Sequence, residues 1–261
     1  MQLVEQRSGW HIESFGVTFM RLLISCMECL REFGKPTEEF HKVEFRDDGC
    51  YEITCTYGHE TTTILQQQKF EVLFEIGAHA VLDGYYREAV SSFTSSLERF
   101  YEFSLRVFLE NASKSDLLFQ SCWKKVASQS ERQLGAFTFL WASNFGEPPE
   151  LLSNVQVSFR NEVIHKGKIP SKEEAIQYGN SVLSVIRPKI IAMQGRFSQE
   201  ISKVIFYHLC DCQAALDSQR CVTTMGIPTL VGLMSAEQNK TIEEHLVWLT
   251  EWKHITSQFK D

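Results

Sequence analysis

The stretch Tyr86–Phe108, YREAVSSFTSSLERFYEFSLRVF, carries the clearest structural signal in the chain. Apolar side chains recur along it mostly at steps of three or four residues, at Tyr86, Ala89, Phe93, Leu97, Phe100 and Phe108. This spacing places them on one face of a helix. Six aromatic residues between Tyr85 and Phe103 give that helix a large apolar surface to bury. We therefore expect a mainly α-helical fold built around this long helix, with the aromatic rings in its core.

Helical patterns continue on both sides of this stretch. Before it, an apolar pattern of the same spacing runs from Phe70 to Val81 and stops at Asp83-Gly84. After it we expect helices at 115–130, from Pro148-Pro149 to Gly167, and from Ser171 to about Met193. Residues Ser171 and Glu174 form a capping box that starts the last of these helices. Residues 66–195 are thus predicted to form one helical domain.

The two ends of the chain show different residue patterns from the helical middle. Residues 1–65 contain β-favouring stretches at Phe15–Phe19 and Cys50–Cys55, and Asp47-Asp-Gly49 is a hairpin signal. We interpret 1–65 as a small β-rich module. Residues 196–261 are predicted to form a mixed α/β C-terminal extension, mostly helical, to which the sequence assigns no role.

The overall charge limits how the protein can bind nucleic acid. The chain has 26 Lys and Arg against 33 Asp and Glu, a net charge of -7. Broad coating of nucleic acid usually needs a basic surface, because neutralising phosphates supplies most of the affinity. A local site with a few cations remains compatible with this charge. No apolar run reaches membrane-span length, and the first residues are too polar for a secretory signal, so we expect a cytoplasmic protein without membrane association.

Cysteine spacing near the N-terminus predicts a metal site. Cys26-Met-Glu-Cys29 is a Cys-x-x-Cys pair, and Cys55-Thr-Tyr-Gly-His59 follows it. Two close thiolates and a second close Cys/His pair can surround one zinc ion. Four protein ligands would leave no open position, so we expect a structural zinc, which would give this module its shape, and no catalytic metal. An all-cysteine set with Cys50 in place of His59 is the main competing ligand set.

The segment Phe159–Gly167, FRNEVIHKG, contains the residues with the clearest chemistry. On a helix, Asn161 and His165 share a face, whereas Arg160 and His165 are separated by about 140° around the axis and about 7.5 Å along it. One helix would not converge them on a single phosphate, but two symmetry-related helices could. An Arg and a His at this spacing also arise in helices that have no catalytic role.

These residue types suit RNA cleavage without a metal. Histidine transfers protons near neutral pH, and arginine offers a fork of donors to phosphate oxygens. Asn161 could orient either the histidine or the phosphate. His165 precedes the helix end, where the negative terminus favours a protonated imidazole. Lys166, Lys168 and Lys172 could guide phosphates or could be ordinary surface charge, and Glu98 and Arg99 could support the site or form an ion pair within the protein.

Together with the helical pattern and the capped helix that follows, the R-N-x-x-x-H element resembles the HEPN superfamily over about residues 66–193. The resemblance implies a HEPN-like helical bundle and a metal-independent endoribonuclease that attacks through the RNA 2′-hydroxyl and leaves a 2′,3′-cyclic phosphate. It implies catalysis by Arg160 and His165 with help from Asn161, a composite site in a homodimer, and a toxin or antiphage role, with an antitoxin or activating partner. The alternatives are a catalytically inactive HEPN-like module that binds RNA or a protein, and a zinc-ribbon adaptor whose helical part only dimerises.

Overall fold

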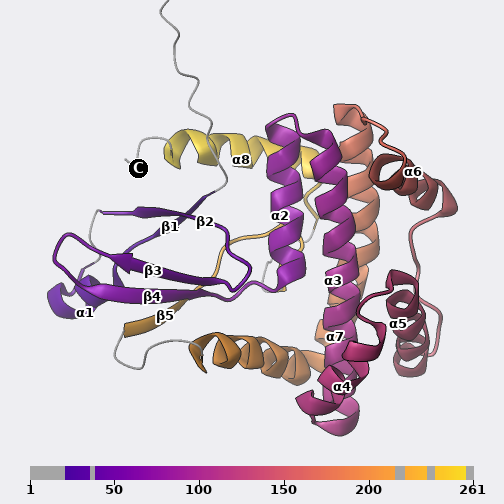
Figure 1. The fold of residues 1–261 in the computed structure, drawn as a ribbon, viewed down its shortest axis with the longest axis horizontal. Helices are drawn as coiled ribbons and strands as arrows, with labels where there is room; N and C mark the ends of the chain where they lie inside the picture. The colour runs from indigo at the N-terminus through magenta and orange to yellow at the C-terminus, as the bar shows by residue number, and fades with distance from the viewer. Residues whose placement is uncertain (1–20, 36–38, 215–220, 234–238, 257–261) are drawn as a thin grey trace, which may run out of the picture.

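The computed structural model describes residues 21–35, 39–214, 221–233 and 239–256. Within these ranges the chain forms eight helices and five short strands. Figure 1 shows a β-rich head on one side and a bundle of long helices on the other. The expected mainly helical fold with a small β-rich region is confirmed. The strand predicted at Phe15–Phe19 lies outside the described residues.

The head contains two small sheets and one short helix. Its elements are β1 (Arg21–Ile24), α1 (Met27–Phe33), β2 (His41–Glu44), β3 (Cys50–Thr54), β4 (Glu60–Leu65) and β5 (Cys221–Met225). Strands β1 and β2 pair antiparallel, and β3 and β4 form an antiparallel hairpin. Strand β5 pairs parallel to β4, with Thr61 opposite Cys221. The head is therefore completed by a strand from the C-terminal part of the chain.

The hairpin predicted at Asp47-Asp-Gly49 is wrong. This turn joins β2 to β3, which belong to different sheets. Gly49 adopts a left-handed conformation there, with φ of 65°, which favours glycine. The hairpin turn lies instead between β3 and β4, where the Gly58 N–H donates to the Cys55 carbonyl at 2.9 Å. The turn signal was genuine, but a local signal does not specify which strands pair across it.

The bundle is built around the predicted long helix. Its helices are α2 (Lys69–Leu82), α3 (Tyr86–Ser113), α4 (Asp116–Val126), α5 (Ser130–Phe145), α6 (Asn154–His165), α7 (Lys172–Ala214) and α8 (Ile242–Thr256). Helix α3 packs against α2, α4, α5, α6 and α7. In Figure 1, α5 and α6 flank the bundle on the side away from the head, and α8 lies beside α2.

Close packing at the centre depends on two glycines. The fully buried ring of Phe93, on α3, packs against Gly77 of α2 and Gly179 of α7. A Cβ added to Gly77 would lie 2.6 Å from this ring, and one added to Gly179 would lie 2.7 Å from it. Real Cβ atoms do not approach so closely. The helices therefore meet at Phe93 because neither neighbour carries a side chain.

Two helix boundaries differ from the sequence prediction. Helix α6 does not start at Pro148-Pro149, since Ser153 caps it and its first residue is Asn154. The side chain of Ser153 accepts the Gln156 N–H, which sets the start of the helix there. The capping box at Ser171 is confirmed, because the Ser171 N–H donates to Glu174 and the Glu174 N–H donates to Ser171 Oγ. Helix α7 then continues past Met193 to Ala214, with a backbone break at Phe197.

Two buried carboxylates of α2 hold the segment that connects β5 to α8. Glu75 accepts the Leu230 N–H at 2.6 Å and lies 2.7 Å from Nε2 of His245. Glu71 accepts the Leu233 N–H at 3.0 Å. Burial raises the pKa of Glu71 to about 7. Backbone donors that would otherwise be unsatisfied in the interior thereby find acceptors.

Candidate functional site

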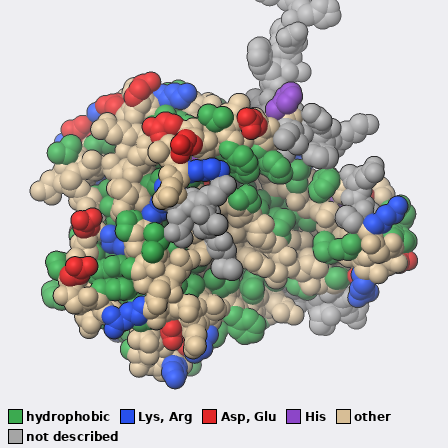
Figure 2. All heavy atoms as spheres, turned by 180° about the vertical axis from the view of Figure 1, so that it is seen from behind, with side chains coloured by type: hydrophobic (Ala, Val, Ile, Leu, Met, Phe, Trp, Pro, Cys, Tyr) green, Lys and Arg blue, Asp and Glu red, His purple; other side chains and the backbone are tan. Residues whose placement is uncertain are grey.

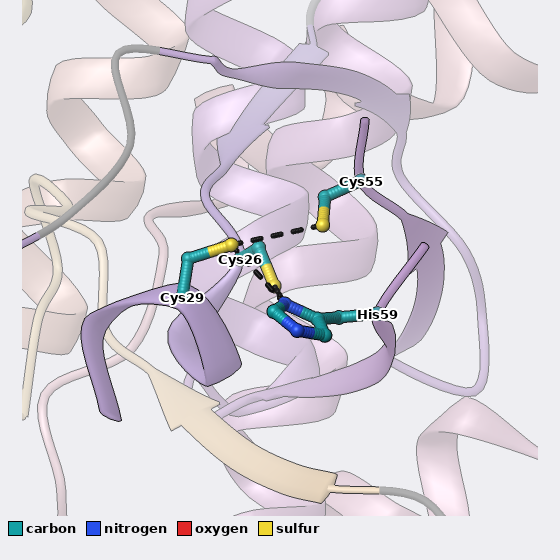
Figure 3. Close-up of side chains that lie close together, drawn as sticks. All are labelled: Cys26, Cys29, Cys55 and His59. Atoms are coloured by element: carbon teal, nitrogen blue, oxygen red, sulfur yellow. Dashed lines mark hydrogen bonds between the residues drawn. The ribbon is translucent and has the colours of Figure 1, made fainter. Parts of the chain in front are cut away.

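The four predicted metal ligands lie together in the head. Cys26 precedes α1 and Cys29 lies within it, whereas Cys55 and His59 flank the turn between β3 and β4 (Figure 3). Their ligand atoms all lie within 4.8 Å of one another. Residues that are distant in sequence therefore meet where a helix N-terminus faces a hairpin turn.

The spacing of these atoms fits a tetrahedral zinc ion. With zinc bonds of about 2.3 Å to sulfur and 2.0–2.1 Å to nitrogen, sulfur atoms would be separated by about 3.8 Å, and sulfur and nitrogen by about 3.6 Å. The Sγ atoms of Cys29 and Cys55 are 3.7 Å apart. Nδ1 of His59 lies 3.2 Å from Cys29 Sγ and 3.8 Å from Cys26 Sγ. The four residues can thus hold a metal ion, as the spacing predicted.

Burial of this cluster disfavours charged thiolates unless a cation is bound. Cys26, Cys29 and Cys55 are buried. Burial, with hydrogen bonds from the two neighbouring thiols, raises the pKa of the Cys29 thiol to about 12. Three thiolates in such a position need a cation to compensate their charge, and a bound metal supplies it.

Glu32 is a supporting residue that the sequence reasoning missed. Its Oε2 lies 2.8 Å from Nε2 of His59, so the Nε2–H donates to the carboxylate. Metal-bound histidines commonly donate their second N–H in this way, which fixes the ring orientation and leaves Nδ1 free for the metal. Glu32 follows Cys29 by three residues, one helical turn, and that spacing was the available signal.

Cys50 does not join the cluster. The group that comes together contains His59, and Cys50 is absent from it. The Cys50 thiol instead donates to the Asp48 carbonyl at 3.4 Å. Cys50 therefore belongs to a different part of the head, and the competing all-cysteine ligand set is not supported.

The R-N-x-x-x-H residues lie on the last turns of α6. Nη1 of Arg160 lies 4.0 Å from Oε1 of Glu98 on α3, and the two side chains are 25% and 32% exposed. Asn161 is partly buried, and His165 is exposed as the final residue of the helix. In the described part of the chain, no hydrogen bond is found for the side chains of Asn161 or His165. Both groups are therefore available to a ligand.

Of the polar groups proposed to support this motif, Glu98 contacts it and Arg99 does not. Arg99 instead pairs with Glu102 on its own helix. Lys168 is also engaged, with its Nζ 2.9 Å from Glu174. Arg160 is thus the cation of the motif that pairs with a neighbouring helix, α3.

The surface near the bundle has no continuous basic face in the view of Figure 2. Among the residues drawn in colour, Lys and Arg side chains are interspersed with Asp and Glu, and hydrophobic groups lie between them. In the described ranges, no helix combines the length and the apolar character that a membrane span requires. On the face shown in Figure 2, a nucleic-acid contact would therefore rest on a few local groups.

Comparison with models of protein families, with curated proteins and with solved structures gives no match. The likeness to the HEPN superfamily therefore rests on the motif of α6, the helical pattern around it and the capped helix that follows.

Proposed function

We propose that this protein is a metal-independent endoribonuclease whose chemistry is carried by Arg160, Asn161 and His165. The observation that supports this most directly is the placement of the motif. Arg160 is held by Glu98, while His165 projects into solvent at the end of the same short helix. A fixed cation and a free imidazole are the two groups that phosphodiester cleavage by general acid–base catalysis needs.

In the proposed reaction, the RNA 2′-oxygen attacks the adjacent phosphorus while the bond from phosphorus to the 5′-oxygen breaks. A base takes the 2′-hydroxyl proton, and an acid gives a proton to the departing 5′-oxygen. The guanidinium of Arg160 stabilises the additional negative charge on the phosphate oxygens. The products are a 2′,3′-cyclic phosphate and a 5′-hydroxyl. His165 is suited to proton transfer near neutral pH, and the negative end of α6 favours its charged form.

The site requires a second copy of the chain. The helix separates Arg160 and His165 by about 140° around its axis, so one copy cannot direct both groups at one phosphate. Two copies of α6 facing each other would place two arginines and two histidines around one cleft. The position of α6 at the outer edge of the bundle leaves this helix accessible to a second copy (Figure 1).

We further propose that the ion held by the head is zinc in a structural role. Three sulfurs and one imidazole are ligands that zinc prefers, and all four positions are filled by protein. The ion would link α1 to the β3–β4 hairpin. It would take no part in RNA cleavage.

The test is cleavage of a mixed RNA substrate by the purified protein in the presence of EDTA, with zinc content measured after the reaction. We expect cleavage, and we expect Arg160→Ala and His165→Ala to abolish it. Arg132→Ala and His254→Ala are matched controls on exposed parts of α5 and α8 and should keep full activity. Equal activity in the wild type and in both motif variants would exclude this assignment.

A toxin or antiphage role is part of the proposal, with an antitoxin or activating partner as regulator. Growth arrest on expression of the wild type, and its absence with His165→Ala, is the expected cellular result. A wild-type protein that binds RNA or a partner protein without cutting RNA would favour the inactive HEPN-like module instead.

A further inference from the structure

A second group of metal-binding side chains lies where the head meets the bundle. His208 and Cys212 are four residues apart on α7 and share a helix face. Nδ1 of His208 lies 3.8 Å from Sγ of Cys212. This separation is close to the roughly 3.6 Å that sulfur and nitrogen have when both bind one tetrahedral zinc ion.

Cys50 of β3 approaches the same point from the head. Its thiol and that of Cys212 donate to one acceptor, the carbonyl of Asp48, at 3.4 Å and 3.2 Å. Cys50 is 7% exposed. Two sulfurs and one imidazole, from elements far apart in the sequence, thus converge on one small region.

The orientation of His208 resembles that of a histidine prepared for a metal. Its Nε2 lies 3.1 Å from the Leu65 carbonyl and donates to it, so the proton resides on Nε2. Nδ1 is then an acceptor directed towards Cys212. The ring also packs on Gly49, where an added Cβ would lie 3.8 Å from it. The imidazole is therefore held in place from two sides.

We propose that Cys50, His208 and Cys212 bind a second zinc ion, separate from the one proposed in the head. Soft sulfur ligands combined with imidazole favour zinc over hard cations such as magnesium. Three protein ligands leave a fourth position for water or another donor. All three residues line a cleft of about 820 Å³ between the head and the bundle.

Binding at this second site requires both thiols to give up their hydrogen bonds to the Asp48 carbonyl, because a metal-bound thiolate has no proton to donate. In the described part of the chain, Cys26, Cys29, Cys55 and His59 form the group whose ligand atoms all lie within 4.8 Å of one another. The ligand atoms of the second group are spread more widely. Rotation of its two cysteine side chains about their Cα–Cβ bonds would turn the sulfurs from Asp48 towards a shared ion.

The full-length protein, purified under reducing conditions, loaded with excess zinc and desalted, provides the test. We expect two equivalents of zinc per chain by elemental analysis. Cys50→Ser, His208→Gln and Cys212→Ser should each reduce this to one, and Cys26→Ser should also leave one, because it removes the other ion. Cys122→Ser, at an exposed cysteine on α4, is the matched control and should keep two.

Cobalt titration of the wild type provides a second measurement that does not depend on the folding of a variant. Two binding steps should form five cobalt–sulfur bonds in total. The intensity of the sulfur-to-cobalt charge-transfer absorption measures how many of these bonds form in each step. A wild type that binds one equivalent, or a Cys212→Ser variant that keeps two, would overturn the proposal. Neither result bears on RNA cleavage.

Discussion

The carboxylate of Glu32 lies 2.8 Å from Nε2 of His59, whereas Nδ1, the other ring nitrogen, faces the cysteine sulfurs. This contact sets which nitrogen of His59 is free for a metal. It also connects the first helix of the head to the hairpin turn through a side chain that is not itself a ligand. Removing the Glu32 carboxylate should therefore weaken metal binding without removing a ligand.

We expect Glu32→Gln to lower zinc affinity about 10- to 100-fold, the range typical for the loss of a residue that orients a metal-bound histidine. The measurement is zinc competition with a chelator of known affinity. Glu28→Gln is the matched control, since Glu28 is on the same helix and pairs with Arg31 instead. Equal affinity in both variants and the wild type would contradict the role given to Glu32.

The contrast between the Cys/His cluster and the proposed catalytic motif shows what the sequence could predict. Cys26 and Cys29 sit one helical turn apart, and Cys55 and His59 flank one tight turn, so local spacing was enough to identify each pair. The chemistry of the ligands then indicated that the two pairs meet. Arg160 and His165 have no such local constraint, because in the proposed site they converge only with the help of a second chain.

Long-range pairing was the part of the fold that the sequence did not reveal. Strand β5 pairs with β4 although about 160 residues separate Thr61 from Cys221. Its β-branched residues, Val222, Thr223 and Thr224, favour a strand but contain no information about its partner. The same applies to Glu71 and Glu75, whose carboxylates accept hydrogen bonds from the backbone N–H groups of Leu233 and Leu230. The capping box at Ser171 was predicted correctly because all of its contacts are local.

Gly77→Ala should destabilise the protein by about 1–3 kcal/mol, because the new methyl group would overlap the buried ring of Phe93. Gly135→Ala is the matched control. Gly135 is also within a helix, on α5, but nothing lies within 4 Å of its Cβ position. There the higher helix propensity of alanine should stabilise by up to about 1 kcal/mol. Urea unfolding of both variants measures the difference, and a Gly77→Ala protein as stable as the control would contradict this packing.

Mixing two inactive variants tests the composite site. Arg160→Ala and His165→Ala homodimers should each be inactive. After the two proteins are unfolded and refolded together, mixed dimers should form that contain one intact Arg160 and one intact His165. We expect partial recovery of RNA cleavage, because the two remaining groups can face one phosphate across the interface. Recovery is measured against each variant refolded alone. A mixture as inactive as its components, although mixed dimers are shown to form, would argue against shared catalysis.

The pH dependence of stability should reveal the burial of Glu71. Its pKa rises from 4.5 in the unfolded chain to about 7 in the fold, so the folded state binds the extra proton between these values. This contribution is fully present below pH 4.5 and is lost as the pH rises through 7. Burial lowers the pKa of His79 to about 4. The stability that His79 contributes changes with pH in the opposite direction, because it is lost as the pH falls.

Comparison of the wild type with Glu71→Gln isolates the first effect, because His79 and the zinc ligands titrate in both proteins. The wild type should lose stability relative to the variant as the pH rises from 4.5 to 7, by up to about 3 kcal/mol, and the difference should then stay constant. Urea unfolding at a series of pH values measures it. Because Gln can still accept the Leu233 N–H through its side-chain oxygen, the variant should fold. A difference that does not change with pH would mean that Glu71 ionises normally in the fold, and that its hydrogen bonds to the segment after β5 offset the whole cost of burial.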